Sequence, residues 1–133
     1  MAVPGNGLIV PVIKQADTLN MTGLCRQIND LALRARAKKL TMDDLTGGTF
    51  TFSNVGSFGT LAATPIILQP QVGIYASGVI QKRPVVVGDA IAVRNMMYGT
   101  HAYDHRLVDG ELGGKFLEAI HQNLRDMDPK DMF

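Results

Sequence analysis

The spacing of hydrophobic positions changes along the chain, and each change predicts a different element. Residues 8–13 (LIVPVI) form a β-branched apolar run after turn residues, which predicts a strand. Pro11 cannot donate to a β-ladder, which favours an edge position or an irregular strand. From Asn20 to Ala35 the apolar residues fall on one face of a helix, so we expect a helix with Asn20 as its N-cap.

The middle of the chain predicts several short strands. Residues 41–45 indicate a capped single turn, and residues 49–53 have the composition of a strand. Three further apolar runs predict strands: residues 72–77, 79–87 and 91–98. The turn residues Gly88 and Asp89 predict an antiparallel hairpin between the last two runs. We expect the last strand to continue towards Asp104.

Helical spacing returns after Gly110. Apolar residues recur on one face from Leu112 to Met127, and Pro129 ends the pattern. The order strand, helix, several strands, helix predicts an α/β or α+β fold, with helices packed on a mixed or mostly antiparallel sheet. The 133 residues contain no internal repeat or interdomain linker, which predicts a single domain over residues 1–133.

Composition and charge narrow the classes of function. A hydrophobic fraction of 46% and a charged fraction of 19% are ordinary for a globular protein. The formal net charge of +1 gives no electrostatic reason to expect nucleic acid or an anionic membrane as a partner. No apolar run reaches the roughly 18–20 residues that span a bilayer. Residues 1–7 lack the regions of a signal peptide, so we expect a soluble intracellular protein.

The single cysteine, Cys25, gives no support for a zinc site or a disulfide framework, so no metal is expected. Cys25 lies beside the apolar stripe of the predicted helix, which favours a buried thiol over a nucleophile. Four basic residues follow at the predicted helix end, where cations complement the helix dipole: Arg34, Arg36, Lys38 and Lys39. An anionic ligand is the alternative interpretation of this cluster.

Residues 101–110 (HAYDHRLVDG) hold the densest group of ionisable side chains, at a place where a strand gives way to a helix. A histidine side chain can take up a proton and return it within one catalytic cycle, which makes His105 a candidate for acid–base catalysis. A structural interpretation stands beside this one. Asp109 before a helical run is a good N-cap, and Asp104 with Arg106 suits an ordinary ion pair.

Residues 104–110 (DHRLVDG) resemble the DHRxxDG signature of the dihydrolipoamide acyltransferases of 2-oxo acid dehydrogenase complexes, whose fold is shared with chloramphenicol acetyltransferase. Other segments resemble the same family in the same order: residues 7–13 (GLIVPVI), 33–36 (LRAR), 47–56 (GGTFTFSNVG), 64–67 (TPII), 70–71 (PQ) and 96–98 (MMY). The resemblance implies a chloramphenicol acetyltransferase-like fold, an α+β two-layer sandwich. Because the family's catalytic domain begins upstream of these matches, we expect its C-terminal portion, truncated at the N-terminus.

The resemblance implies acyl transfer between dihydrolipoamide and coenzyme A. It gives His105 the role of general base and Ser53, at a Ser or Thr position of the family, that of donor to the oxyanion. Asp109 matches an Asp or Asn position and is expected to orient the catalytic loop or to interact with the site. Coenzyme A is a substrate, and the lipoyl group belongs to a separate lipoyl domain. The sequence leaves the acyl group open between acetyl, succinyl and branched-chain.

The same resemblance implies partners and a location. It implies a homotrimer in which His105 of one chain acts with Ser53 of its neighbour, and a larger multienzyme core built from trimers. The dehydrogenase and dihydrolipoamide dehydrogenase components are the further partners. The expected location is the bacterial cytoplasm or, in a eukaryote, the mitochondrial matrix.

Two alternatives stay open. The chain is also compatible with a truncated, catalytically inactive fragment that keeps only the oligomeric scaffold. A serine hydrolase using Ser57 or Ser53 with His105 and Asp109 is less favoured. The sequence contains no GxSxG motif, and a spacing of four residues between His105 and Asp109 is not a demanding one.

Overall fold

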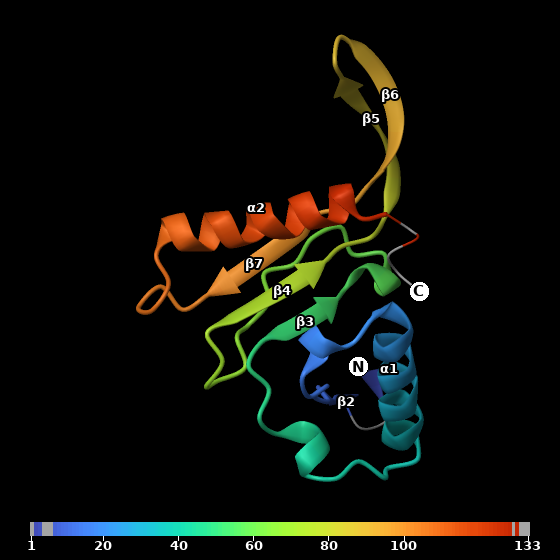
Figure 1. Cartoon of the computed structure of the whole chain (residues 1–133), viewed down its shortest axis with the longest axis vertical. Coiled ribbons are helices and arrows are strands. Elements are labelled where there is room, and N and C mark those ends of the chain that lie inside the picture. Colours follow the sequence, from blue (N-terminus) through green and yellow to red (C-terminus); the bar gives the residue numbers. More distant parts are fainter. Residues whose placement is uncertain (1, 4–6, 129, 131–133) are drawn as a thin grey trace. The chain divides into compact units, whose positions relative to one another are not determined.

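The computed structural model describes residues 2–3, 7–128 and 130 (Figure 1). The chain divides into two compact units, one formed by Met1–Gly48 with Gln122–Phe133 and the other by Thr49–His121. The single domain over residues 1–133 stays a prediction. Neither helix in the described ranges is long and apolar enough to cross a membrane.

The first unit is built around one helix. Its elements are β1 (Ala2–Val3), β2 (Gly7–Leu8), the short 3-10 turns η1 (Ala16–Thr18) and η2 (Asp43–Leu45), and α1 (Met21–Arg36). Strands β1 and β2 pair antiparallel. The predicted cap at Asn20 is confirmed, because the Gly23 N–H donates to Asn20 Oδ1 at 2.9 Å. The buried face of α1 is formed by Leu31 and Ala35.

Two predictions for this unit are wrong. The strand expected over residues 8–13 ends at Leu8. Pro11 has no N–H to donate, and the Val12 N–H bonds the Asp44 carbonyl at 2.8 Å, so the segment pairs with a turn instead of a ladder. Cys25 is exposed, not buried. It lies on the flank of the apolar stripe, and the buried part of α1 is confined to the turns around Leu31.

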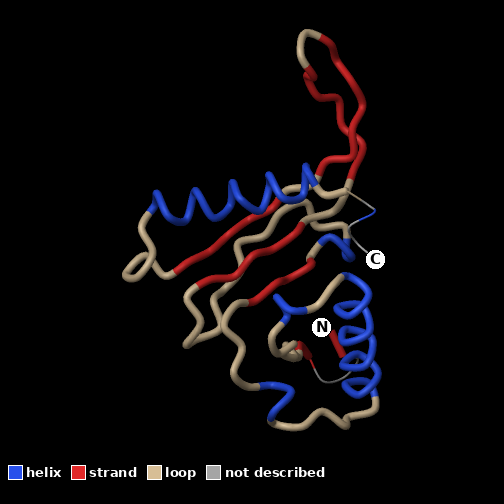
Figure 2. The backbone as a smooth tube through the Cα atoms, viewed as in Figure 1, coloured by secondary structure: helices blue, strands red, loops and turns tan. Residues whose placement is uncertain are grey.

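The second unit contains a three-stranded sheet, a hairpin and a helix. Its elements are β3 (Thr51–Asn54), the 3-10 turn η3 (Gly56–Phe58), β4 (Gly73–Ser77), β5 (Gln81–Val87), β6 (Ala90–Met96), β7 (Gly99–Tyr103) and α2 (Gly110–Asp126) as far as His121. In the sheet, β4 lies between β3 and β7 (Figure 2). Strand β3 is parallel to β4, and β7 is antiparallel to it. All five residues of β4 are buried, as expected for a central strand covered on both faces. The predicted mixed sheet is therefore present.

The predicted hairpin is confirmed, but its continuation into β7 is not. Strands β5 and β6 pair antiparallel from Gln81↔Met96 to Val87↔Ala90 around the turn at Gly88, whose φ is +61°. The strand expected from residue 91 to Asp104 is interrupted between β6 and β7. The Tyr98 carbonyl accepts from the Gly78 N–H at 2.8 Å, outside the hairpin ladder. This bond redirects the chain from the hairpin into the sheet.

Candidate functional site

The loop between β7 and α2 presents His105 on a firmly held backbone. At its start, the Asp104 N–H donates to the Val72 carbonyl at 2.9 Å. The Asp104 carboxylate then accepts the Arg106 N–H at 3.0 Å and the Arg106 Nη2 at 2.6 Å. Arg106 lowers the pKa of Asp104 to about 2, so the pair stays ionised near neutral pH. The expected ion pair therefore flanks His105 and restrains the backbone around it.

Asp109 closes the other end of this loop as the cap of α2. Its Oδ1 accepts the Leu112 N–H at 2.8 Å, and its carbonyl accepts the Gly113 N–H at 3.0 Å. The structural interpretation of Asp109 is thus confirmed. Its expected role in holding the catalytic loop is compatible with this position, because the cap fixes the point where the loop enters the helix.

Replacement of Asp109 by alanine should lower the free energy of unfolding by about 0.5–2 kcal/mol, because the Leu112 N–H loses its acceptor. Asparagine keeps an acceptor oxygen, so Asp109→Asn should cost only a fraction of that. Urea unfolding curves of the three proteins provide the measurement. An unfolding free energy unchanged in Asp109→Ala would show that the cap does not stabilise the helix.

Ser53 and His105 lie at different ends of the sheet within one chain. Ser53 in β3 pairs with Ala76, and Ala76 pairs with Thr100 near the start of β7. Strand β7 ends at Tyr103, three residues beyond Thr100, and three residues span roughly 10 Å along a strand. His105 lies in the loop that follows this end of β7. Two-residue alternation also places the Ser53 and Tyr103 side chains on opposite faces. The structure therefore does not bring the two predicted catalytic residues together within one chain.

An apolar pocket of about 230 Å³ lies between α2 and the sheet, beside the His105 loop. It is lined by Phe50, Val72, Gly73, His101, Tyr103, Val108, Leu112 and Phe116. His101 and Tyr103 were not predicted as site residues from the sequence. Their spacing of two residues in a strand was the available signal, since it places both rings on one face. That face is the one on which α2 packs.

His101 is a half-buried titratable group in this pocket, and its Nδ1 atom is buried. Its Nδ1 has no hydrogen-bond partner in the described part of the chain. Burial lowers the pKa of His101 below its usual 6.5, and the nearby Gly113 backbone opposes this shift without outweighing it. The folded chain therefore favours the neutral imidazole.

This shift predicts a loss of stability in mild acid. Because the unfolded chain binds the proton more readily, the stabilisation from neutral His101 is complete above about pH 6.5 and is lost as the pH falls below it. We expect the wild-type protein to lose more unfolding free energy than His101→Leu between about pH 7.5 and pH 5.5. Urea unfolding at the two pH values measures the difference. The same loss in both proteins would rule out His101 as the source.

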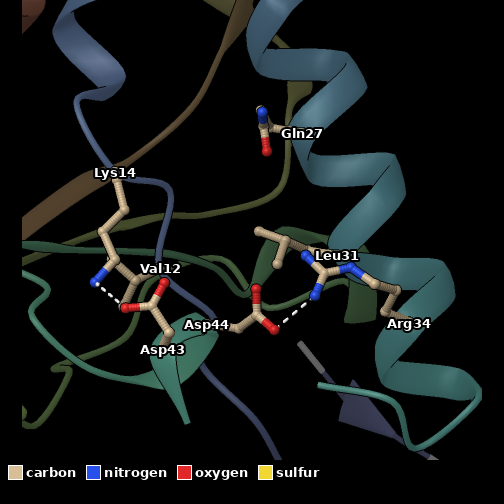
Figure 3. A pocket seen from close by; sticks show the side chains of 7 residues that line it. All are labelled: Val12, Lys14, Gln27, Leu31, Arg34, Asp43 and Asp44. Atoms are coloured by element: carbon tan, nitrogen blue, oxygen red, sulfur yellow. Dashed lines mark hydrogen bonds and ion pairs between the residues drawn. The ribbon is translucent and has the colours of Figure 1, made fainter. Parts of the chain in front are cut away.

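The first unit has its own polar pocket, of about 200 Å³ (Figure 3). Arg34 pairs with Asp44 at 2.6 Å and with Asp30 at 2.8 Å, and Lys14 lies 3.6 Å from Asp43. The Arg34 guanidinium holds the pKa of the Asp44 carboxyl well below its usual range. Since these cations already face carboxylates, the pocket gives no support to an anionic ligand at Arg34.

No group of three or more His, Cys, Asp or Glu side chains suited to a metal ion occurs among the described residues. The acidic side chains of the His105 loop instead form an ion pair or cap the helix that follows. The chemistry that this loop offers is proton transfer by an exposed imidazole on a fixed backbone.

Comparison with known proteins identifies the family. The 2-oxoacid dehydrogenases acyltransferase (catalytic domain) family matches residues 1–133. The chain is 47% identical over 125 residues to the dihydrolipoyllysine-residue acetyltransferase component of the pyruvate dehydrogenase complex of Mycobacterium bovis, covering 90% of this chain and 23% of that protein. It is also 47% identical over 120 residues to the mitochondrial dihydrolipoyllysine-residue succinyltransferase component of the 2-oxoglutarate dehydrogenase complex of Mus musculus, covering 90% of this chain and 26% of that protein.

Solved structures agree with the sequence comparison. The probable dihydrolipoamide acetyltransferase from Listeria monocytogenes superimposes with a TM-score of 0.93 at 44% identity, covering 97% of this chain and 56% of that one. The dihydrolipoamide acetyltransferase of Azotobacter vinelandii gives 0.89 at 36% identity, covering 92% and 50%. The chain thus spans about half of these structures, and the chloramphenicol acetyltransferase-like fold is confirmed. This chain belongs to the 2-oxoacid dehydrogenase acyltransferase family and matches its catalytic domain.

Proposed function

We propose that this chain forms part of an enzyme that transfers an acyl group between dihydrolipoamide, carried by a lipoyl domain, and coenzyme A. The observation that carries the proposal is an exposed histidine, His105, on a loop fixed by the Asp104–Arg106 pair and the Asp109 cap. The family supplies the reaction class, since the relatives are named as acetyl- and succinyltransferases acting on dihydrolipoyllysine.

In the proposed mechanism His105 acts as general base. A thiol with a pKa near 8–9 is only a few per cent ionised at neutral pH, so a positioned base accelerates its attack by roughly 10²–10⁴-fold. His105 takes the proton of the coenzyme A thiol as sulfur attacks the thioester carbonyl. The tetrahedral intermediate then collapses, the carbon–sulfur bond to the lipoyl group breaks, and His105 returns the proton to the lipoyl thiolate.

Ser53 is the proposed donor to the oxyanion of that intermediate. In the Azotobacter vinelandii dihydrolipoamide acetyltransferase, a serine, a histidine and an asparagine have roles in the catalytic mechanism. That serine precedes the histidine by 52 residues and the asparagine follows it by four. Ser53 and Asp109 stand at the same separations from His105. The equal spacing supports these three residues as the site, with Asp109 in the place of the asparagine.

The site is proposed to form between chains of a homotrimer. Ser53 and His105 lie at different ends of one sheet, so a second copy is needed to supply the missing partner. The β5–β6 hairpin supports such an association, because it exposes Val86 (75%), Ile91 (80%) and Val93 (62%). An isolated two-stranded hairpin is marginal in water, whereas burial of each such side chain stabilises by about 1.5–3 kcal/mol.

A larger core is proposed from the same relatives. One solved relative, 35% identical, is the cubic core of the pyruvate dehydrogenase multienzyme complex. We extend the proposal to a multienzyme core of this kind, with the lipoyl domain, the dehydrogenase and dihydrolipoamide dehydrogenase as partners.

Incubation of the purified chain with dihydrolipoamide and acetyl-, succinyl- or a branched-chain acyl-coenzyme A tests the proposed reaction. We expect acyl-dihydrolipoamide and free coenzyme A in equal amounts, quantified by mass spectrometry. Coenzyme A released equally fast without dihydrolipoamide would indicate hydrolysis and favour the serine hydrolase. A folded oligomer that transfers none of these acyl groups would contradict the proposal and favour the scaffold fragment.

A further inference from the structure

A row of aromatic rings leads from α2 to His105. The ring centroids of Phe116 and His101 are 5.0 Å apart, and those of His101 and Tyr103 are 5.2 Å apart. The ring centroids of Tyr103 and His105 are 5.7 Å apart, with an interplanar angle of 42°. Phe50 supports the inner end of the row, 5.5 Å from Phe116. The exposed imidazole is therefore the outer end of a row of packed rings.

The Tyr103 ring has little freedom to move. Its backbone is held in β7 by pairing with Gly73, and its ring lies against the backbone of α2 at Gly113. A Cβ atom added at Gly113 would lie 2.5 Å from a carbon of the Tyr103 ring, so only glycine leaves room for the ring at that place. The His101 ring also packs against the Tyr103 ring, with the two ring centroids 5.2 Å apart. A strand, a helix and a neighbouring ring thus fix Tyr103.

The loop hydrogen bonds do not fix the imidazole itself. The Asp104 and Asp109 contacts hold the backbone before and after His105, but a side chain on a fixed backbone still has several staggered rotamers. Contact with a rigid ring favours the rotamer that keeps the contact. Tyr103 is placed to supply that restraint, because its ring packs against the imidazole and is itself packed against α2 and the His101 ring.

We propose that Tyr103 is a positioning residue, whose ring holds the His105 imidazole in the orientation that accepts the thiol proton. The inference rests on the proposed acyl transfer. Its chemical logic is that proton transfer needs the base within hydrogen-bond reach of the proton, so loss of orientation slows the reaction without weakening substrate binding. The phenol hydroxyl has no part in this role, and a phenylalanine ring should replace it.

Kinetics of two Tyr103 variants test the proposal. Tyr103→Leu should lower kcat by about 10- to 10²-fold with KM changed by less than about twofold, whereas Tyr103→Phe should stay within about threefold of wild type. Tyr98→Leu is the matched control, because Tyr98 lies between β6 and β7, outside the row of rings. Equal losses in Tyr103→Leu and Tyr103→Phe, or a normal kcat in Tyr103→Leu, would overturn the proposal.

A spectroscopic readout separates this inference from the proposed reaction. The Tyr103 ring current should shift the NMR signals of the His105 ring, assigned by their disappearance in His105→Asn. The shift should vanish in Tyr103→Leu and persist in Tyr103→Phe. An unmoved His105 signal in Tyr103→Leu overturns the positioning role whether or not the protein transfers acyl groups. Absence of transfer in wild type, with the expected NMR shifts, counts against the reaction alone.

A second variant covers the case in which Tyr103→Leu does not fold. Gly113→Ala keeps the tyrosine but forces its ring away from α2, since the added methyl carbon would lie 2.5 Å from the ring. We expect the same fall in kcat with little change in KM, together with a moved His105 signal. Gly114→Ala is the control, because a Cβ there meets nothing within 4 Å. Identical kinetics and spectra for the two glycine variants would overturn the proposal.

Discussion

Replacement of His105 by alanine should lower kcat by at least about 10²-fold with little change in KM, because a general base acts in the transition state. The imidazole is exposed at the end of a loop whose backbone is fixed on both sides, so its removal should leave the fold intact. Steady-state kinetics with dihydrolipoamide and acyl-coenzyme A provide the measurement.

His121→Ala is the matched control for this variant. His121 is also exposed but lies in the middle of α2, away from the loop. Its replacement should leave kcat near the wild-type value. A His105→Ala protein that keeps activity within a few-fold of wild type would remove His105 from the mechanism and, with it, the proposed proton transfer.

The second large effect is expected at Ser53. A preorganised donor to an oxyanion contributes roughly 10²–10³-fold to kcat, so Ser53→Ala should lower kcat by about 10²-fold. Ser53→Thr keeps a hydroxyl and should retain much more activity.

Ser57→Ala is the control, since Ser57 lies beyond the end of β3 in the exposed turn η3. Its N–H donates to Asn54 Oδ1, a bond that survives loss of the hydroxyl. A large loss at Ser57 with a normal rate at Ser53 would mean that the oxyanion donor has been placed on the wrong serine.

Elements that depend on local chemistry were predictable from the sequence. The Asn20 cap, the Gly88 turn and the Asp109 cap each need only a few neighbouring residues, and each was found. The prediction of a strand over residues 8–13 was wrong, because the apolar composition of this segment is equally compatible with an irregular segment. The partner of Val12 is a turn carbonyl 32 residues away, which local patterning cannot indicate.

The candidate site was predictable in its residues but not in its geometry. The signature around His105 and the family position of Ser53 gave both candidates. Their separation follows from the sheet register, in which parallel β3 and antiparallel β7 flank β4. The contact of Tyr103 with α2 likewise depends on how α2 lies on β7, which no periodicity specifies. Strand order and helix placement are set by long-range packing.

The central claim is that one chain supplies His105 and its neighbour supplies Ser53. The impaired variants His105→Ala and Ser53→Ala can be mixed at equal amounts, unfolded and refolded together. In a cyclic trimer with random mixing, about one quarter of the interfaces combine an intact His105 with an intact Ser53. The mixture should therefore recover about one quarter of wild-type kcat, while each variant refolded alone stays about 10²-fold or more below wild type. A refolded mixture that is oligomeric but as inactive as the separate variants would contradict the shared site.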